Sequence, residues 1–160
     1  MSKQTIYIDL DGVIVDIEKY INETYSPEYI KQHGIGKIID MHPKIFYASP
    51  PMPGAVSAFR ELAQKHEVYI LSTAPWDNPE SWKAKRIWVE EHLGSEAYKR
   101  LILSHNKGLL RGDYLIDDRK VNGVAEFEGT HIHFGSIDTP DWDTVLELIK
   151  ISEEDDSSSL

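Results

Sequence analysis

The chain has 160 residues, which is the size of one domain and leaves little for a second. Its 27 acidic residues against 17 basic ones give a formal net charge of −10, which argues against a surface that coats a nucleic-acid polymer. It contains no cysteine, which excludes disulfides, thiolate catalysis and zinc–thiolate sites.

Short apolar runs alternate with amphipathic stretches along most of the sequence. In chain order, the patterns predict a strand over Thr5–Leu10, a helix over Pro53–Lys65, a strand over Glu67–Leu71, a helix over Pro79–Leu93, strands over Arg100–Leu103, Asp113–Ile116 and Thr130–Phe134, and a helix over Asp141–Ile151. Such alternation is typical of an α/β fold with a mainly parallel sheet flanked by helices. No apolar stretch approaches membrane-spanning length, and Met1 to Gln4 lead straight into the first strand. We therefore expect no signal peptide, no membrane partner and a cytoplasmic protein.

Two segments depart from this alternation. Residues 16–52 are rich in aromatic residues and too long for a plain connection, so we expect a small helical cap inserted after the first strand. The core would then comprise residues 1–15 and 53–151. Residues 152–160 are acidic and serine-rich with almost nothing to bury, and we expect them to be disordered.

Polar residues follow four of the predicted strands. In open sheets of this kind, ligands bind beyond the carboxyl ends of the strands. The residues at these ends are Asp9 and Asp11, Ser72 and Thr73, Ser104 to Lys107, and Asp117 and Asp118. This coincidence predicts a site at one edge of the sheet.

Asp9-Leu10-Asp11-Gly12 places two carboxylates on the same side of an extended chain, because residues two apart share a face. Gly12 lets the chain turn away without a Cβ clash. A carboxylate can accept a phosphoryl group, and a second carboxyl can donate a proton to the leaving alkoxide and then activate water. The alternative is an ordinary Asp-Gly turn or helix cap.

The other candidate site residues are common in proteins, and none of them indicates a site by itself. Ser72 or Thr73 could bind a phosphate oxygen or merely cap a strand. Lys107 and Lys85 could neutralise a phosphoryl group or lie in solvent, although Lys85 falls on an apolar helix face. The carboxylates of Asp117 and Asp118 could bind Mg²⁺, which prefers oxygen ligands, or this segment could be an ordinary surface turn. Their occurrence in order, each at a strand end, favours a phosphoryl-transfer site.

With these motifs, the chain resembles the haloacid dehalogenase-like (HAD) phosphatase superfamily. Within it, the sequence is similar to the cytosolic-type 5′(3′)-deoxyribonucleotidases. The similar stretches are DLDGVIVDIE (Asp9–Glu18), PMPGAVSAFREL (Pro51–Leu62), VYILSTAP (Val68–Pro75), KRIWVEEHLG (Lys85–Gly94), ILSHNKGLLRGDYLIDDR (Ile102–Arg119) and the segment around Trp142. The resemblance covers nearly the whole chain except the cap and the tail. It implies a Rossmann-like HAD core and a Mg²⁺-dependent phosphomonoesterase that forms an aspartyl-phosphate and acts on deoxyribonucleoside monophosphates.

The resemblance also implies roles for the four aspartates. Asp9 would be the nucleophile and a metal ligand. Asp11 would be the general acid and base and would offer its backbone carbonyl to Mg²⁺. Asp117 would be a metal ligand, with Asp118 beside it as a further ligand, directly or through water.

The phosphate-binding residues implied by the resemblance are Ser72, Thr73 and a lysine. Both Lys107 and Lys85 fall in similar stretches. We favour Lys107 as the residue that contacts the phosphate and the nucleophile.

The cap is where this chain departs from the family, because it is shorter than in the vertebrate enzymes and contains no tryptophan. Phe46, Tyr47 and Trp76 could stack on a base, or the cap aromatics could form a small core of their own. The substrate could thus also be a sugar phosphate or a phosphoamino acid, and a non-catalytic binding protein on the same fold is a further alternative. The protein could also form a homo-oligomer, which the sequence does not decide. His131 and His133 alternate on one strand without a third ligand nearby, so we interpret them as structural or surface residues.

Overall fold

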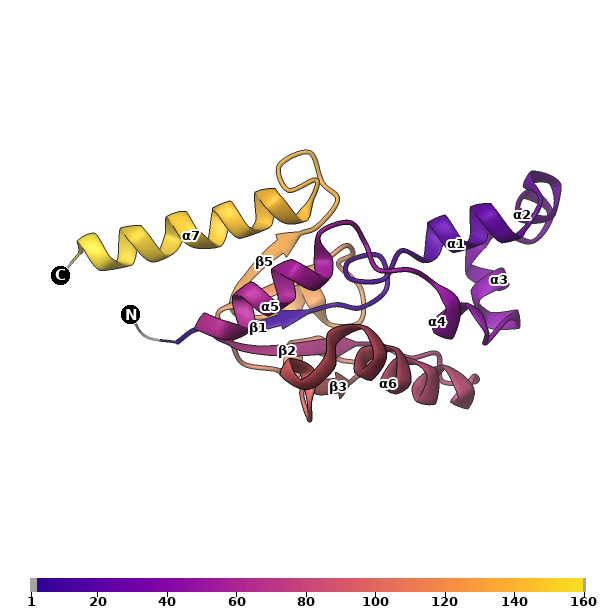
Figure 1. Ribbon diagram of the computed structural model, residues 1–160, viewed down its shortest axis with the longest axis horizontal. Coiled ribbons are helices and arrows are strands. Elements are labelled where there is room, and N and C mark those ends of the chain that lie inside the picture. Colours follow the sequence, from indigo (N-terminus) through magenta and orange to yellow (C-terminus); the bar gives the residue numbers. More distant parts are fainter. Residues whose placement is uncertain (1–2, 160) are drawn as a thin grey trace.

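The computed structural model describes residues 3–159, and its centre is a five-stranded parallel sheet in the order β3-β2-β1-β4-β5 (Figure 1). The strands are β1 (Thr5–Ile8), β2 (Glu67–Ser72), β3 (Leu101–Leu103), β4 (Tyr114–Asp117) and β5 (Thr130–His133). In the centre of the sheet, Ile8 pairs with Ile70 on one side and with Ile116 on the other. The predicted α/β fold is confirmed, and every predicted strand is present within a few residues of its expected bounds.

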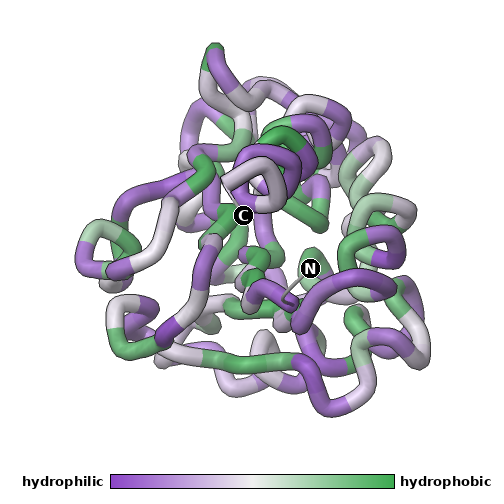
Figure 2. Tube along the Cα trace, turned by 90° about the vertical axis from the view of Figure 1, so that its left-hand side faces the viewer, coloured by the Kyte–Doolittle hydropathy of each residue, from purple (hydrophilic) through white to green (hydrophobic). Residues whose placement is uncertain are grey.

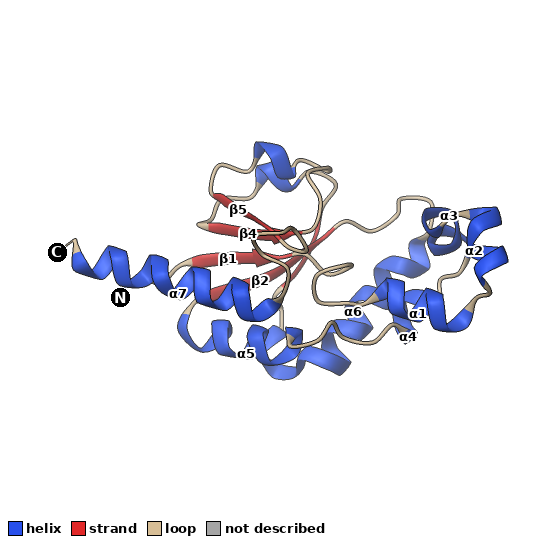
Figure 3. Cartoon of the chain, turned by 90° about the horizontal axis from the view of Figure 1, so that it is seen from above, coloured by secondary structure: helices blue, strands red, loops and turns tan. Residues whose placement is uncertain are grey.

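The two faces of the sheet are covered differently. Ile6, Ile8, Ile70 and Ile116 point to the face that packs against three long helices, α5 (Ala55–Lys65), α6 (Pro79–Leu93) and α7 (Trp142–Ser158). Figure 3 shows α5 and α7 together on this side. The opposite face carries a smaller cluster that includes Tyr7 and Leu115, and it is covered by short segments, among them the 3₁₀ turns η2 (Lys107–Leu109) and η3 (Val124–Glu126). A third 3₁₀ turn, η1 (Gly94–Ala97), follows α6. Hydrophobic and hydrophilic stretches alternate along the chain in Figure 2, as expected for elements with one buried face.

Residues 16–52, here called the cap segment, form four short helices beyond the end of β1 (Figure 1). They are α1 (Ile17–Thr24), α2 (Pro27–His33), α3 (Ile35–Met41) and α4 (Ile45–Ala48). Asp16 and Ser26 cap the first two of them, because their side chains accept hydrogen bonds from backbone N–H groups in the first turn. The segment is tied to the core where the indole N–H of Trp88, on α6, donates to the Ser49 carbonyl over 2.8 Å. None of the helices within residues 3–159 has the length and apolar character needed to cross a bilayer.

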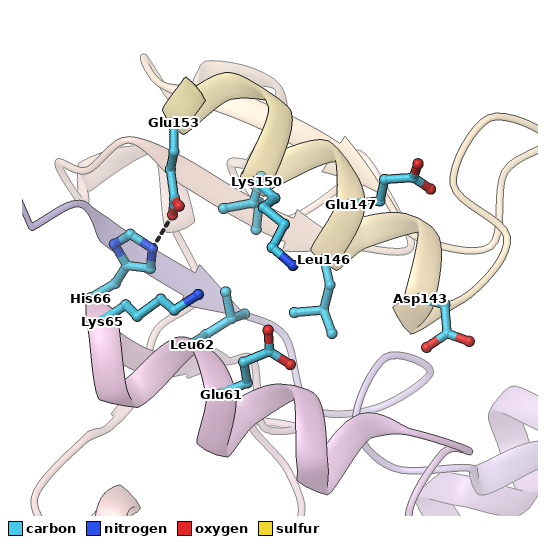
Figure 4. A pocket seen from close by; sticks show the side chains of 10 residues that line it. Glu61, Leu62, Lys65, His66, Asp143, Leu146, Glu147, Lys150 and Glu153 are labelled. Atoms are coloured by element: carbon cyan, nitrogen blue, oxygen red, sulfur yellow. Dashed lines mark hydrogen bonds and ion pairs between the residues drawn. The ribbon is translucent and has the colours of Figure 1, made fainter. Parts of the chain in front are cut away.

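Helix α7 runs further than the sequence indicates. We expected residues 152–160 to be disordered, but the helix continues to Ser158; of these nine residues, Leu160 lies outside the described range. Two contacts hold its extension on the core: the Tyr114 and Ser152 hydroxyls are 2.5 Å apart, and the Glu153 carboxylate meets the His66 ring (Figure 4). Once a helix is anchored, each further residue adds one backbone hydrogen bond, so α7 can continue through the acidic and serine-rich residues although they bury little.

Candidate active site

Neighbouring strands bring most of the predicted site residues to one edge of the sheet. Asp9 directly follows β1, Ser72 ends β2, and Asp117 ends β4. Because β1 lies between β2 and β4, these three residues meet at the middle of the carboxyl edge. Lys107 reaches the same place from η2, which follows the edge strand β3.

Lys107 forms the central contact of the site. Its Nζ lies 3.0 Å from Asp9 Oδ1 and 2.5 Å from Asp117 Oδ2, and all three side chains are buried. Burial lowers the pKa of Lys107, but the charges of Asp9 and Asp117 and their hydrogen bonds raise that pKa by more, so it lies above its ordinary value. The ammonium is therefore held in its charged form against two carboxylates.

The acidic residues at this edge fit a hard divalent cation. Asp9, Asp117 and Asp118 each offer one carboxylate oxygen, and these oxygens lie within 4.8 Å of one another. Asp118 Oδ1 is buried and has no hydrogen-bond partner among the described residues. Three converging carboxylate oxygens are the donor set that ions such as Mg²⁺ prefer.

The protonation of these carboxylates also reflects their crowding. Burial raises the pKa of Asp9 to about 7; Lys107 opposes this rise, and the charges of Asp117 and Asp11 add to it. Burial and the neighbouring Asp117 likewise raise the pKa of Asp118, while Arg119 lowers it. A cation bound among these residues would favour their ionised forms.

Asp11 has a different lysine as its partner. Lys85, buried on α6, pairs through Nζ with the Asp11 carboxylate and lies 4.9 Å from the centroid of the Phe46 ring. The two predicted lysines therefore separate: Lys107 contacts Asp9, whereas Lys85 contacts Asp11. Directly after Asp11, Gly12 lets the chain turn with φ +80°. Only glycine fits there, because a Cβ would lie 2.3 Å from Asp118 Oδ2.

The two predicted hydroxyl residues lie at the end of β2 in different surroundings. Thr73 lines a small polar cavity together with Asp9, Asp11 and Lys107, and its hydroxyl donates to the Ser104 carbonyl over 2.8 Å. Ser72 is buried, and its Oγ has no partner among the described residues. Thr73 thus lines the same cavity as Asp9, and the Ser72 hydroxyl is not used by the described residues.

A larger cavity, of about 610 Å³, lies between the core and the cap segment and adjoins the polar one. The two cavities share Asp11 and Arg119. The cap segment lines the larger one with apolar side chains, namely Ile17, Ile35, Ile39 and Met52. The sequence does not reveal this apolar wall or the place of Arg119, because only the fold brings α1 and α3 opposite Asp11.

The aromatic residues predicted for the substrate pocket do not gather at the site. Phe46 is only 3% exposed and packs in the core. The Tyr47 hydroxyl donates to Glu80 on α6. Trp76 is 75% exposed, with its ring edge-on to Trp82. Within residues 3–159, none of these three side chains lines either cavity.

Comparison with known proteins assigns the chain to a family. Residues 40–141 match the family of the 5′ nucleotidase, deoxy (Pyrimidine), cytosolic type C proteins. A protein of Vibrio phage KVP40 that carries a 5′(3′)-deoxyribonucleotidase name is 51% identical, over 92% of this chain and 85% of its own length. The 5′(3′)-deoxyribonucleotidase of Bacillus subtilis is 30% identical, over 82% of this chain and 85% of its own. The human cytosolic-type 5′(3′)-deoxyribonucleotidase is 27% identical, over 88% and 78%.

Solved structures show the same fold at low sequence identity. A haloacid dehalogenase-like hydrolase from Streptococcus pneumoniae has a TM-score of 0.58 at 14% identity, covering 91% of this chain and 90% of its own. A HAD hydrolase from Bacillus subtilis, described as bound to magnesium, has a TM-score of 0.58 at 11% identity, covering 92% and 99%. The chain therefore has a HAD-like fold, belongs to the cytosolic type C 5′ nucleotidase family and is a hydrolase of phosphoric monoesters.

Proposed function

We propose that this protein is a Mg²⁺-dependent phosphomonoesterase that forms an aspartyl-phosphate on Asp9 and dephosphorylates deoxyribonucleoside monophosphates. The observation that carries the proposal is the Lys107 ammonium between Asp9 and Asp117, beside Asp118, at the carboxyl edge of the sheet. The names of the relatives, 5′(3′)-deoxyribonucleotidases, support the substrate class.

The carboxylates of Asp9, Asp117 and Asp118 would hold Mg²⁺, together with the backbone carbonyl of Asp11. When bound, the ion offsets negative charge on the phosphoryl group and on the carboxylates around it. Lys107 adds a positive charge from the protein itself. An acidic chain with a net charge of −10 needs such local cations to accept an anionic substrate.

In the first step, a carboxylate oxygen of Asp9 attacks the phosphorus atom, and the bond from phosphorus to the ester oxygen breaks. The carboxyl group of Asp11 gives its proton to the departing alkoxide, which leaves as an alcohol. Lys85 keeps the Asp11 side chain near Asp9, and Asp11 must exchange this ion pair for a proton before it can act as the acid. Lys107, Thr73 and the Ser72 hydroxyl would bind the phosphoryl oxygens.

In the second step, the Asp11 carboxylate takes a proton from water. The water oxygen attacks phosphorus, and the bond between phosphorus and Asp9 breaks, which releases inorganic phosphate. Asp9 is left as a carboxylate, and Asp11 again carries a proton. The overall reaction consumes one water molecule and yields an alcohol and phosphate.

The nucleoside part of the substrate would occupy the cavity of about 610 Å³ that adjoins the polar one. We propose that the cap segment closes over the core and that Ile17, Ile35 and Ile39 contact the sugar and base. Arg119 lines both cavities and would lie near the junction of phosphate and sugar. A second candidate substrate class is a smaller phosphate ester, such as a sugar phosphate or a phosphoamino acid, because none of the three aromatic residues predicted to stack on a base lines these cavities.

The substrate test is a panel of deoxynucleoside 5′- and 3′-monophosphates, ribonucleotides, sugar phosphates and phosphoserine, assayed for phosphate release with Mg²⁺ and with a chelator. We expect the deoxynucleotides to give the highest kcat/KM. Equal rates across the panel would favour the second class, and no phosphate release at all would favour a non-catalytic binding protein.

The mechanism is tested separately with Asp9→Asn, for which we expect no turnover. The matched control is Asp138→Asn at an exposed position outside the site, which should keep wild-type activity. Rapid quenching of the wild type followed by mass spectrometry should find a phosphorylated peptide that contains Asp9. Turnover by a properly folded Asp9→Asn protein would refute the covalent mechanism.

A further inference from the structure

Two histidines on β5 contact the backbone of Asp117 and Asp118. His131 and His133 lie two residues apart, and their ring centroids are 5.6 Å apart. His131 Nε2 lies 3.0 Å from the Asp117 carbonyl oxygen, and His133 Nε2 lies 2.9 Å from the Asp118 carbonyl oxygen. The sequence predicts both as structural or surface residues, but in the structure their rings contact the backbone carbonyls of two candidate metal ligands, Asp117 and Asp118.

The direction of these hydrogen bonds follows from the chemistry of the acceptor. A backbone carbonyl oxygen can only accept, so each Nε2 must carry the hydrogen. An imidazole with hydrogen on Nε2 is either the neutral tautomer or the imidazolium, and both donate from that atom. The two contacts therefore do not depend on the charge of the rings.

The His133 contact continues through one peptide group to Asp117. The carbonyl of the Asp118–Arg119 peptide accepts from His133, and the N–H of the same peptide donates to Asp117 Oδ1 over 3.0 Å. The other oxygen of Asp117, Oδ2, accepts from Lys107, which also contacts Asp9. Both carboxylate oxygens of Asp117 are thus oriented, one of them by a peptide that His133 holds.

This orientation opposes electrostatic repulsion. Asp9, Asp117 and Asp118 bring carboxylate oxygens within 4.8 Å of one another, and the chain after β4 could relieve the repulsion by turning Asp118 away. Strand β5 resists this movement, because His133 pairs with Asp117 in the sheet and the Phe134 N–H also donates to the Asp117 carbonyl over 3.1 Å. The histidine side chains extend this hold by one residue, to Asp118.

We propose that His131 and His133 are positioning residues that fix the Asp117–Asp118 backbone so that the site's carboxylates stay converged for a metal ion. The inference rests on the proposed function for the identity of the ion, but not for the hydrogen bonds themselves. The histidines act on the ion site through the backbone of Asp117 and Asp118, and His133 also lines the cavity of about 610 Å³.

The test uses His133→Leu, which removes the donor, and His133→Gln, whose amide keeps a donor at a similar reach; His131 is treated in the same way. Thr130→Val, at an exposed position on the same strand, is the matched control. Hydrogen–deuterium exchange of the metal-free proteins reports on the amide of Arg119, and Mg²⁺ titrations followed by thermal shift report on the ion. For His133→Leu we expect faster exchange at Arg119 and a Mg²⁺ affinity weaker by about 10- to 100-fold, the range found when groups that orient metal ligands are removed.

The Gln variant and the Thr130 control should stay close to wild type in both measurements. In activity assays, saturating Mg²⁺ should restore much of the kcat of His133→Leu; KM is measured separately, because His133 also lines the cavity proposed for the nucleoside. A folded His133→Leu protein with wild-type exchange and Mg²⁺ affinity would overturn the inference, as would a Gln variant as impaired as the Leu variant. A wild-type protein that does not respond to Mg²⁺ would refute the proposed metal site instead, and the exchange measurement would still decide the positioning role.

Discussion

At the scale of single residues, Lys107 holds the site together by charge. It is buried between Asp9 and Asp117, so its replacement by Met leaves two buried carboxylates without their cation. Loss of one partner of a buried ion pair costs about 3–5 kcal/mol, although protonation of Asp9 would relieve part of this. We expect Lys107→Met to lower the melting temperature in a chelating buffer and to reduce kcat by about 100-fold or more, as when other charge-stabilising groups are removed. Lys37→Met, at an exposed position in α3, should change neither measurement.

Gly12 offers a second test at this scale, with an unusually close control. Gly12 and Gly34 have nearly the same backbone angle, φ +80° and +77°, but a Cβ on Gly12 would meet Asp118 Oδ2, whereas a Cβ on Gly34 would meet nothing within 4 Å. Both Ala variants should lose about 1–3 kcal/mol of stability, because side chains rarely adopt a positive φ. Only Gly12→Ala should also lose its thermal response to Mg²⁺ and its activity, because it displaces Asp118. Equal activity of the two variants would contradict the placement of Asp118 at the site.

At the scale of elements, the sequence was sufficient wherever a local pattern carries the information. Each strand end that carries polar residues was visible because a buried apolar run stops at an aspartate or a hydroxyl residue, as at Ile8 and Asp9. The extent of α7 was not visible, because its last residues have little to bury and depend on Tyr114 and His66, which lie far away in the sequence. The same limit applies to His131 and His133, whose acceptors are backbone carbonyls at the end of β4 and directly after it.

The extension of α7 gives the prediction at this scale. Glu153 and His66 are both largely buried between α5 and α7 (Figure 4), so Glu153→Ala leaves the His66 Nε2 without its partner. An unsatisfied buried polar group costs about 1–3 kcal/mol. We expect the melting temperature to fall by several degrees with kcat unchanged, since the pair lies at the other end of the sheet from Asp9. Glu154→Ala, one residue on and exposed, should leave the melting temperature where it is; an equal fall in both variants would show that the His66 contact contributes nothing.

At the scale of the whole molecule, the strand order decides which residues meet. Asp9 and Asp117 adjoin because β4 returns to lie beside β1, and no local pattern in the sequence contains that order. Because β1 and β4 are parallel and Ile8 pairs with Ile116, the residues that follow them, Asp9 and Asp117, lie at the same edge of the sheet. From the sequence alone, this meeting could be predicted only by the general rule that ligands bind at the carboxyl ends of strands in open sheets. The cap segment was predicted as helical from its composition, but which of its side chains face Asp11 depends on how four short helices pack against the core.

Because the candidate metal site joins β1 to β4, metal binding should stabilise the entire fold. An ion that binds only the folded state at 100 times its Kd adds about 2.7 kcal/mol to the free energy of unfolding. For a chain of 160 residues this corresponds to a rise of roughly 5–10 °C in melting temperature, at about 2–4 °C for each kcal/mol. Divalent salt also screens a net charge of −10, so the comparison must be made against NaCl at equal ionic strength. We expect Mg²⁺ to raise the melting temperature well above the NaCl control in the wild type and in Asp138→Asn. In Asp117→Asn, the melting temperatures with Mg²⁺ and with NaCl should be equal. An equal rise with Mg²⁺ and NaCl would mean that the carboxylates of Asp9, Asp117 and Asp118 bind no ion, and that Lys107 alone balances their charge.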